Sequence, residues 1–506
     1  MTTSYKEIVG RARGAFKDGR TLSVEFRRQQ LQQLKKMYEE NSHVFLKALH
    51  SDLRKPKLEG MMLEIQGLIN DVDYSLNRLD KWVKAEEVTS AIPFDKSYIY
   101  KEPYGVVLVL GAWNYPLQLT MLPVAGAIAA GNAVVIKPSE VSPATAAAIA
   151  NLVPKYIDKD CYPVVCGGIP ETTELLKERF DYIFYTGSTT VGRIVREAAN
   201  KYLTPVTLEL GGKSPCYIDQ DVNMDMVARR ILWGKLINLG QTCIAPDYIL
   251  CTKATEKLFV EKAKEILQEW YGEDPQKSEN LCRIVAERHV DRLEEYIKCG
   301  EPVVGGKVDR KDRWVEPTIL VNVDRDSKIL KEEIFGPILP IVNVDSHVEA
   351  IAYINKGEKP LAMYIFSNNK TKTEIFMKQV PCGGVTLNDT ILHVASAELP
   401  FGGVGNSGIG SYHGKFSFET FTHRKACLSR SYNSFIDKAM RARFPPYTEK
   451  NLKLLTSQKD KGDGPGFFHY LKIFFTHVIS MGLGALILYL VIHYSESKGS
   501  IDSDIE

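Results

Sequence analysis

The chain of 506 residues is long enough for two or three domains, each with a core of its own. Apolar residues make up 44% of it and charged residues 25%, an ordinary globular balance. The 64 basic and 62 acidic side chains leave a formal net charge of +2, so there is no basic excess of the kind that nucleic-acid binding requires. We therefore expect no nucleic-acid partner.

The nine cysteines are odd in number and scattered along the chain. None of their spacings matches a zinc site, so we expect no metal. A chain of this size also needs no disulfides for stability. The cysteines are best interpreted as reduced thiols in a protein that faces the cytosol.

The N-terminal segment does not resemble a signal peptide, because charges recur every few residues and no long apolar run is present. Leu31, Leu34 and Tyr38 recur at helical spacing and indicate that residues 1 to about 90 are helical. "SYIYKEPYGVVLVL" at 97–110 then predicts a strand, a break and a second strand that is apolar on both faces, as in a buried parallel sheet.

From residue 105 the chain alternates between strand and helix patterns. The expected strands are "GVVLVL", "NAVVIK", "CYPVVC", "DYIFYT" and "PVTLEL", with Ala-rich or amphipathic helices between them. This βαβ repetition predicts a doubly wound α/β sheet that binds ligands at the carboxyl ends of its strands. The pattern restarts near Gly212 and continues to about Lys415, and residues 416–460 are expected to form a strand and connecting segments.

The segment Ile473–Tyr494 contains no Asp, Glu, Lys or Arg. As a helix, its 22 residues span about 30 Å, the thickness of a bilayer core. A buried core helix is the alternative, but the segment follows the loop-like "QKDKGDGPG" and shows no polar stripe. We predict a transmembrane tail anchor.

Basic residues flank the predicted span unequally. Lys459, Lys461 and Lys472 precede it, whereas only Lys498 follows it. The positive-inside rule then keeps the large N-terminal part in the cytosol. The endoplasmic reticulum is the expected membrane, with the peroxisome and the mitochondrial outer membrane as alternatives.

Two segments have the character of nucleotide contacts. "FYTGSTTVGR" places Gly187 after a strand and Gly192 in the helix that follows, where free backbone N–H groups favour anions. The spacing matches neither the G-x-G-x-x-G fingerprint nor the P-loop, so the turn alone is equally a structural connection. Lys137 and Glu140 follow another buried strand, where a ribose contact or an ordinary surface pair is expected.

Polar residues in apolar or turn-rich surroundings are the candidates for catalysis. Glu209 lies in an apolar strand before two glycines, as a general base or as a paired structural carboxylate. Asn114 in "WNYP" can donate to a developing oxyanion, although an Asx turn is the default for an isolated Asn. Glu333, Phe335 and Phe401 stand in turn-rich contexts that alone indicate only structure.

Two cysteines lie close together in "NLGQTCIAPDYILC". Neither Cys243 nor Cys251 has a neighbouring His, Lys or Arg to form a thiolate. Cys251 lies in an apolar strand-like run and is expected in the core.

Several of these motifs occur together in a fixed order. The set resembles the NAD(P)-dependent aldehyde dehydrogenase superfamily over residues 1 to about 450, and its N-terminus, "GSTTVGR" and "RFPPYTEKNLKLL" are similar to the class 3 branch. Together with the C-terminal span, the chain most resembles the membrane-anchored fatty aldehyde dehydrogenases. The motifs are "GAWNYPLQL", "VVIKPSE", "FYTGSTTVGR", "LELGGKSP", "GQTC", "EEIFGPILP" and "PFGGVGNSGIG".

The resemblance implies a reaction and roles for the matching residues. Cys243 matches the nucleophile that forms a thiohemiacetal and then a thioester. Asn114 and the Cys243 backbone N–H match the oxyanion donors, and Glu209 matches the base for hydrolysis. In class 3 enzymes Glu209 and Glu333 both qualify as the base, and we favour Glu209.

The resemblance also implies a dinucleotide cofactor, with NAD favoured and NADP possible. Lys137 and Glu140 match adenosine-ribose contacts, and Glu333 and Phe335 match nicotinamide-ribose contacts. The pyrophosphate turn corresponds to Gly187, Ser188 and Gly192.

The same resemblance implies the domain organisation and a homodimer. The expected parts are an NAD-binding domain at 1–211 with a bridging element at 82–105, a catalytic domain at 212–415, a bridging and oligomerisation segment at 416–460, and the anchor at 473–494.

The predicted substrate is a medium- or long-chain aliphatic aldehyde. Tyr115, Trp233 and Phe401 are candidates for an apolar tunnel, with core packing as the equal alternative. An anchor would hold the enzyme where such aldehydes partition, since each buried methylene contributes about 0.8 kcal/mol. Alternatives are a CoA-acylating dehydrogenase, an anchored structural protein with a vestigial site, and a generic nucleotide-binding membrane protein.

Overall fold

The structure is a computed structural model that describes residues 4–90, 95–430, 432, 434–456 and 467–499. Two compact units are present. The larger unit comprises residues 1–84 and 101–423, and the smaller comprises 85–100 and 424–506.

The larger unit begins with a layer of helices, as the apolar spacing predicts. Ser4 caps the first of them, since its side chain accepts the backbone N–H of Glu7 and the Glu7 carboxylate accepts the N–H of Ser4. These elements are α1 Tyr5–Lys17, η1 Arg20–Leu22, α2 Val24–Glu40, α3 Ser42–Leu53, α4 Lys57–Gly60, the π-helix η2 Met61–Gln66, α5 Gly67–Leu76 and α6 Leu79–Trp82.

The first α/β part is built on a five-stranded sheet of order β16-β6-β5-β3-β4. Strands β3 to β6 run parallel and are fully buried, which explains their continuous Val- and Ile-rich sequences. Its strands are β3 Val106–Leu110, β4 Ala133–Lys137, β5 Tyr182–Thr186, β6 Val206–Glu209 and β16 Gly408–Ile409, and its helices are α7 Gln118–Ala130, α8 Pro143–Tyr156, α9 Ile169–Leu175, α10 Thr189–Asn200 and α17 Gly414–Thr420.

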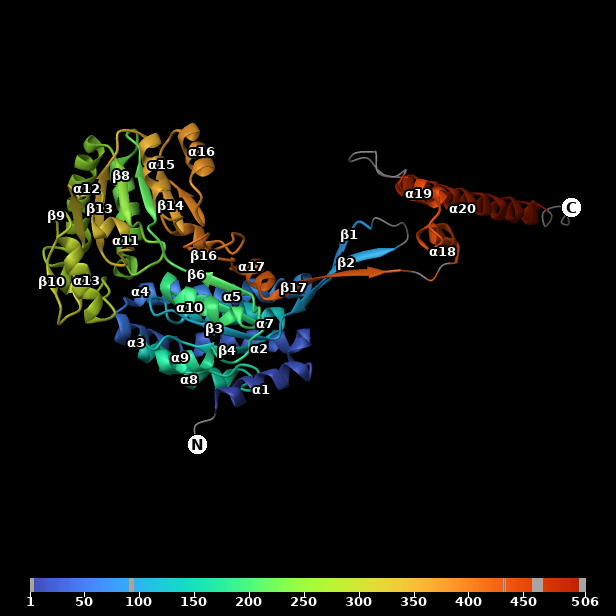
Figure 1. Ribbon diagram of the computed structural model, residues 1–506, viewed down its shortest axis with the longest axis horizontal. Helices are drawn as coiled ribbons and strands as arrows, with labels where there is room; N and C mark the ends of the chain where they lie inside the picture. Colours follow the sequence, from blue (N-terminus) through green and yellow to red (C-terminus); the bar gives the residue numbers. More distant parts are fainter. Residues whose placement is uncertain (1–3, 91–94, 431, 433, 457–466, 500–506) are drawn as a thin grey trace. The chain divides into compact units, whose positions relative to one another are not determined.

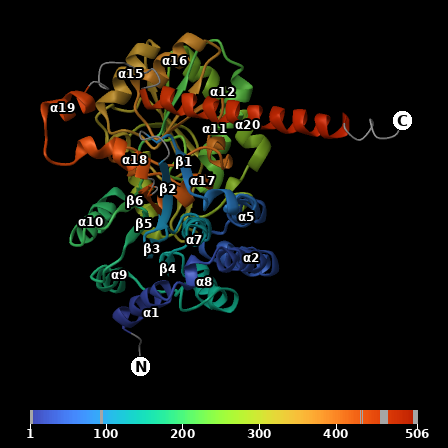
Figure 2. The same ribbon diagram turned by 90° about the vertical axis from the view of Figure 1, so that its right-hand side faces the viewer.

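Helices cover both faces of this sheet (Figure 1, Figure 2). Apolar residues of α1 and α10 pack with Val106 and Leu108 on one face, whereas α7 packs with Val107 and Val109 on the other. Successive side chains of a strand point to opposite faces, so this division follows directly from the β3 sequence.

The register of the sheet brings the carboxyl ends of its strands together. Leu110, the last residue of β3, pairs with Lys137 of β4 and with Tyr185 of β5. Thr186 pairs in turn with Glu209, the last residue of β6. The loops that follow these strands therefore leave from one edge, where an α/β sheet binds its ligands.

The second α/β part is a seven-stranded sheet of order β15-β14-β7-β8-β13-β12-β9. All its pairings are parallel except that of the edge strand β9 with β12. Its strands are β7 Pro215–Ile218, β8 Tyr248–Cys251, β9 Glu301–Val304, β12 Thr318–Val321, β13 Ile338–Asn343, β14 Ala362–Phe366 and β15 Gly384–Leu387, with a separate hairpin of β10 Val308–Asp309 and β11 Trp314–Val315. Its helices are α11 Met224–Leu236, η3 Ile237–Gly240, α12 Lys253–Tyr271, η4 Pro275–Lys277, α13 Glu287–Ile297, α14 Lys328–Lys331, α15 His347–Lys356, α16 Lys370–Gln379 and η5 Leu392–Ala395.

The smaller unit contains most of a three-stranded sheet of order β1-β2-β17 and the C-terminal helices. Within α20, residues 476–493 form the one helical window of the described chain that is long and apolar enough to cross a membrane, and it is unburied. Lys459 and Lys461, two of the basic residues that set the predicted orientation, lie outside the described residues. The elements are β1 Glu86–Val88, β2 Lys96–Pro103, β17 Thr422–Ser429, α18 Ser434–Ala439, η6 Met440–Arg443, α19 Glu449–Thr456 and α20 Phe467–Gly499.

Two expectations about individual elements are wrong. The segment "CYPVVCGG" forms only an isolated bridge between Ile136 and Val164 and not a strand. Pro163 lacks a backbone N–H and two glycines follow the segment, so a continued ladder is disfavoured. Residues 416–460 contain the helices α18 and α19 after the expected strand, where only connecting segments were predicted.

Candidate active site

Cys243 lies in a sharply bent loop between η3 and β8. Asn238 and Leu239 both have positive φ angles, 51° and 52°, and Gly240 continues the bend at 74°. The Gln241 side chain holds the loop, since its Nε2 donates to the carbonyls of Asn238 and Arg283 at 3.0 Å each. The loop therefore presents the cysteine in a defined conformation.

The two cysteines of this segment differ in exposure. Cys243 is half-buried, whereas Cys251 lies in β8 with no exposed surface. The core position expected for Cys251 is confirmed. Only Cys243 of the two is open to a reactant.

The electrostatic surroundings of Cys243 disfavour a resting thiolate. Burial raises the pKa of its thiol far above the usual range, and the carboxylates of Glu333 and Glu209 raise it further. The backbone N–H groups of Cys243 and Ile244 act in the opposite direction, since they donate to the sulfur. The thiol therefore needs a base, and the acidic residues near it are two carboxylates.

Glu209 ends strand β6 and is almost fully buried, at 2% exposure. Neither of its side-chain oxygens has a hydrogen-bond partner among the described residues. Burial raises the pKa of this carboxyl well above its usual value. No partner of the kind that the structural alternative requires is therefore present among the described residues, and Glu209 remains a candidate for a general base.

Glu333 follows α14 and is half-buried. Its pKa rises to about 8, chiefly because of burial and then because of the negative charge of Asp247. The carboxylate lies against the backbone of Gly211, where a β-carbon would collide with it. A side chain at position 211 would therefore displace the Glu333 carboxylate from this position.

Asn114 leaves the carboxyl end of β3 and is buried at 4% exposure. Its Nδ2 donates to the carbonyl of Gln241 at 3.1 Å, which joins the β3–α7 loop to the cysteine loop. An Asn amide has a second N–H, which this hydrogen bond does not use. Hydrogen bonds and electrostatic coupling thus bring Asn114, Glu209, Glu333 and Cys243 into one site.

The residues predicted to bind the adenosine and pyrophosphate part of the dinucleotide lie at the same sheet edge. Lys137 ends β4 and forms an ion pair with Glu140 at 2.6 Å. Ser188 caps α10 by accepting the N–H of Val191 at 3.3 Å. The buried hydroxyl of Thr186, in the same turn, has no hydrogen-bond partner among the described residues. An unsatisfied donor beside a helix N-terminus fits a bound pyrophosphate.

Gly187 and Gly192 allow close packing within this turn. A β-carbon at Gly187 would collide with the Tyr185 hydroxyl, and one at Gly192 with Leu210. Phe335 lies elsewhere along the site, in edge contact with Trp113 at 5.2 Å between ring centroids.

The aromatic candidates for a substrate channel have different surroundings. The Tyr115 hydroxyl forms a 2.8 Å hydrogen bond with Thr242, next to Cys243. Phe401 is buried and stacks on His413 at 5.1 Å. Trp233 on α11 is 38% exposed, so the core-packing alternative is wrong for this residue.

The sequence interpretation missed several residues of the site. Lys235 on α11 is buried, with a side-chain amine that has no hydrogen-bond partner among the described residues. Burial lowers its pKa to about 8, and Glu333 is among the charges that act on it. A Lys inside the apolar run "ILWGKL" was the available signal. Asn238 and Gln241 hold the loop. The sequence indicates neither role, except that Asn238 stands before Leu-Gly.

Comparison with known proteins agrees with this geometry. A profile of the Aldehyde dehydrogenase family matches residues 2–427. The mouse protein "Aldehyde dehydrogenase, dimeric NADP-preferring" is 52% identical over 88% of this chain and 99% of its own, and mouse "Aldehyde dehydrogenase family 3 member A2" is 48% identical over 89% and 94%.

A solved structure, "Substrate bound state of Staphylococcus Aureus AldH", has a TM-score of 0.87 at 40% identity. The alignment covers 90% of this chain and 99% of that one. The fold and the similarity to family 3 expected from the motifs are thereby confirmed. The chain belongs to the aldehyde dehydrogenase family and is an oxidoreductase that uses NAD(P) to oxidise aldehydes.

Proposed function

We propose that this enzyme oxidises medium- and long-chain aliphatic aldehydes to carboxylic acids through a thioester on Cys243. The observation that carries the proposal is one half-buried thiol coupled to two carboxyls of raised pKa, Glu209 and Glu333. The cysteine loop, the end of β6 and the segment after α14 supply these groups from separate parts of the chain. Their convergence is typical of nucleophilic catalysis.

In the proposed first step the Cys243 sulfur attacks the aldehyde carbon after a carboxylate accepts the thiol proton. A thiohemiacetal oxyanion results. The free N–H of the Asn114 amide and the Cys243 backbone N–H stabilise its charge.

Lys137, Glu140, Gly187, Ser188 and Gly192 are the residues that would hold the adenosine and pyrophosphate part of NAD(P), with Glu333 and Phe335 toward the nicotinamide. When bound, the cofactor supplies a hydride acceptor that brings the substrate carbon to the acyl oxidation level. Thr186, with its unsatisfied buried hydroxyl, joins this set. NAD is our preferred acceptor, although one close relative is named NADP-preferring.

In the last step Glu209 removes a proton from water, and the hydroxide attacks the Cys243 thioester. The acid leaves and the thiol is restored. The unpartnered carboxyl of Glu209 supports this role, because transfer to coenzyme A would require no water-activating base.

The substrate preference is supported by the rings near the nucleophile and by the apolar helix. Tyr115 and Tyr412 are electrostatically coupled to Cys243, and Phe401 packs on Tyr412 at 5.8 Å. We place Tyr115, Phe401 and the more exposed Trp233 along a channel for the alkyl chain.

The first experiment measures kcat/KM for aldehydes from two to sixteen carbons, with NAD and with NADP. We expect hexadecanal to exceed acetaldehyde, NAD to exceed NADP, and added coenzyme A to have no effect. Better oxidation of acetaldehyde rejects the substrate proposal. Cys243→Ala should abolish turnover and keep cofactor binding, whereas Cys251→Ala is the matched control and should remain active.

We also propose that α20 anchors a homodimer in the endoplasmic reticulum membrane with the catalytic part in the cytosol. The apolar window 476–493 and the dimeric name of a relative support this. Full-length protein in microsomes should resist carbonate extraction, and a chain ending at residue 456 should not. Release of the full-length protein contradicts the anchor.

A further inference from the structure

A buried ion pair lies beside the site without contacting Cys243. Lys55, between α3 and α4, and Glu64, on the π-helix η2, have no exposed side-chain surface and are 2.5 Å apart. Buried pairs of this kind rarely stabilise a fold more than apolar residues of equal size do. Single π-turns also occur frequently at functional sites. The pair therefore calls for an explanation other than stability.

The pair holds both ends of the turn that carries Asn114. Lys55 Nζ donates to the carbonyl of Asn114 at 3.1 Å and lies over the Tyr115 ring at 4.1 Å. Glu64 Oε2 accepts the backbone N–H of Leu117 at 2.9 Å, and Leu117 immediately precedes helix α7. Each partner uses its remaining hydrogen-bonding capacity on this turn.

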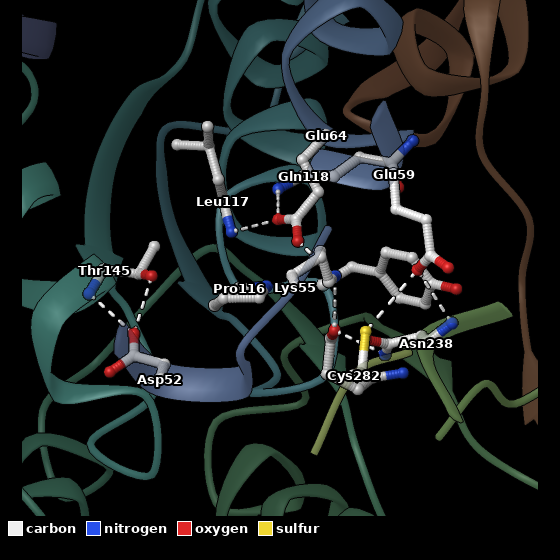
Figure 3. Close-up of polar contacts among 12 residues, drawn as sticks. Asp52, Lys55, Glu59, Glu64, Pro116, Leu117, Gln118, Thr145, Asn238 and Cys282 are labelled. Carbon is white, nitrogen blue, oxygen red and sulfur yellow. Dashed lines mark hydrogen bonds and ion pairs between the residues drawn. The ribbon is translucent and has the colours of Figure 1, made fainter. Parts of the chain in front are cut away.

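Asn238 holds the same turn from the side of the cysteine loop. Its Nδ2 donates to the carbonyl of Asn114 at 2.8 Å and to that of Gln241 at 2.9 Å. Its own backbone N–H donates to Glu59 Oε2 at 2.9 Å, as Figure 3 shows. With φ at 51°, Asn238 adopts a conformation that Asn and Gly tolerate best.

The Asn114 carbonyl is thus fixed by two donors, one on each side. Lys55 ties it to the N-terminal helices and Asn238 ties it to the loop of the nucleophile. A donor stabilises an oxyanion only when its orientation is set before the reaction. Residues that lock the orientation of such a donor are therefore as necessary as the donor.

We propose that Lys55, Glu64 and Asn238 are positioning residues that orient the Asn114 amide toward the oxyanion formed on Cys243. The proposal rests on the proposed role of Asn114. Because Lys55 and Glu64 neutralise each other, their contribution is geometric, and they neither touch the substrate nor exchange protons.

We call Lys55, Glu64 and Asn238 the clamp, and two variants each remove one part of it. Lys55→Met with Glu64→Gln removes the pair without leaving a buried unpaired charge. Asn238→Gly removes the side chain and keeps the left-handed backbone accessible. Asn41→Gly is the matched control, because Asn41 also donates to a carbonyl, that of Met37 at 3.0 Å, but on the N-terminal helices.

Each clamp variant should lower kcat by about tenfold or more, with the Kd of the cofactor unchanged within twofold, whereas Asn41→Gly should keep kcat. In an Asn114→Ala background the clamp variants should change kcat by less than about twofold, because coupled residues are non-additive. An equal loss in both backgrounds overturns the proposal, and so does wild-type kcat in either folded clamp variant.

A second readout separates positioning from general damage. Alkylation of Cys243 by iodoacetamide, followed by peptide mass spectrometry, forms no oxyanion, so its rate should stay within about twofold of wild type. Hydrolysis of p-nitrophenyl acetate forms one and should fall with kcat. A parallel fall in both rates indicates a disturbed loop and contradicts the clamp.

If the double variant does not fold, Asn238→Gly decides the question alone. Failure of the proposed function has a different signature, since Asn114→Ala or Cys243→Ala would then keep full turnover. In that case the clamp has no donor to position, and the positioning proposal is rejected together with the proposed function.

Discussion

At the scale of single residues, the site consists of a thiol without a basic neighbour in the sequence and two carboxyls whose pKa values are raised by burial. In the proposed mechanism, proton transfer among these three groups replaces the cation that usually activates a cysteine. Burial is the largest influence on the pKa of Cys243, Glu209 and Glu333 alike. Burial is therefore the main control on proton transfer in the site. The roles of the two carboxyls can be tested separately.

Replacing Glu209 with Gln should slow the second half of the reaction selectively. The variant lacks the base for hydrolysis, so steady-state turnover should fall by roughly 10²- to 10⁴-fold. A stopped-flow burst of reduced cofactor close to one equivalent per site should remain. Loss of the burst with the turnover would instead assign Glu209 to the first step.

Replacing Glu333 with Gln tests whether this carboxyl also accepts a proton. Its pKa of about 8 means that it is protonated, and inactive as a base, below that pH and becomes ionised above it. If it acts as a base, wild-type kcat should rise with pH through this region, and the variant should lose that limb of the profile. An unchanged profile excludes Glu333 and leaves the proton transfers to Glu209.

At the scale of elements, the parallel strands bring distant residues to one edge. The ends of β3, β4, β5 and β6 carry Asn114, Lys137, Ser188 and Glu209 into adjacent loops. Packing at this edge is tight, and it leaves no room for a β-carbon at Gly187, Gly192 or Gly211.

Gly211→Ala should therefore impair catalysis, because the added methyl group collides with the Glu333 carboxylate. We expect kcat to fall by about tenfold or more, since a misplaced group costs that much or more. Gly14→Ala is the matched control, because its β-carbon meets nothing within 4 Å, and it should keep kcat. Equal activities of the two variants contradict the close approach of Glu333 to Gly211.

At the scale of the molecule, periodicity predicted the helical N-terminus, the alternating strands and the apolar C-terminal helix. These features depend on burial, which the order of apolar residues reports directly. The strand at 161–168 failed because its few apolar residues are interrupted by Pro163 and followed by two glycines. The helices of 434–456 were missed, since that segment is short and Phe444, Tyr447, Leu452 and Leu455 within it are exposed.

The site was only partly predictable for a different reason. Cys243, Glu209 and Asn114 stand in recognisable motifs, whereas Lys55, Glu64 and Asn238 act through contacts between residues more than 50 positions apart in the chain. Spacing along the sequence carries no information on such contacts. Lys235 had a visible signal, a charge in an apolar run, but its place near Glu333 required the fold.

The most direct test of the account is to trap the acyl group on the nucleophile. The Glu209→Gln enzyme would be mixed with NAD and hexadecanal, quenched in acid during the burst, digested and analysed by mass spectrometry. We predict a hexadecanoyl thioester on the peptide that contains Cys243, in an amount equal to the reduced cofactor formed. A burst of reduced cofactor with the acyl group on another cysteine, or on none, would contradict the account.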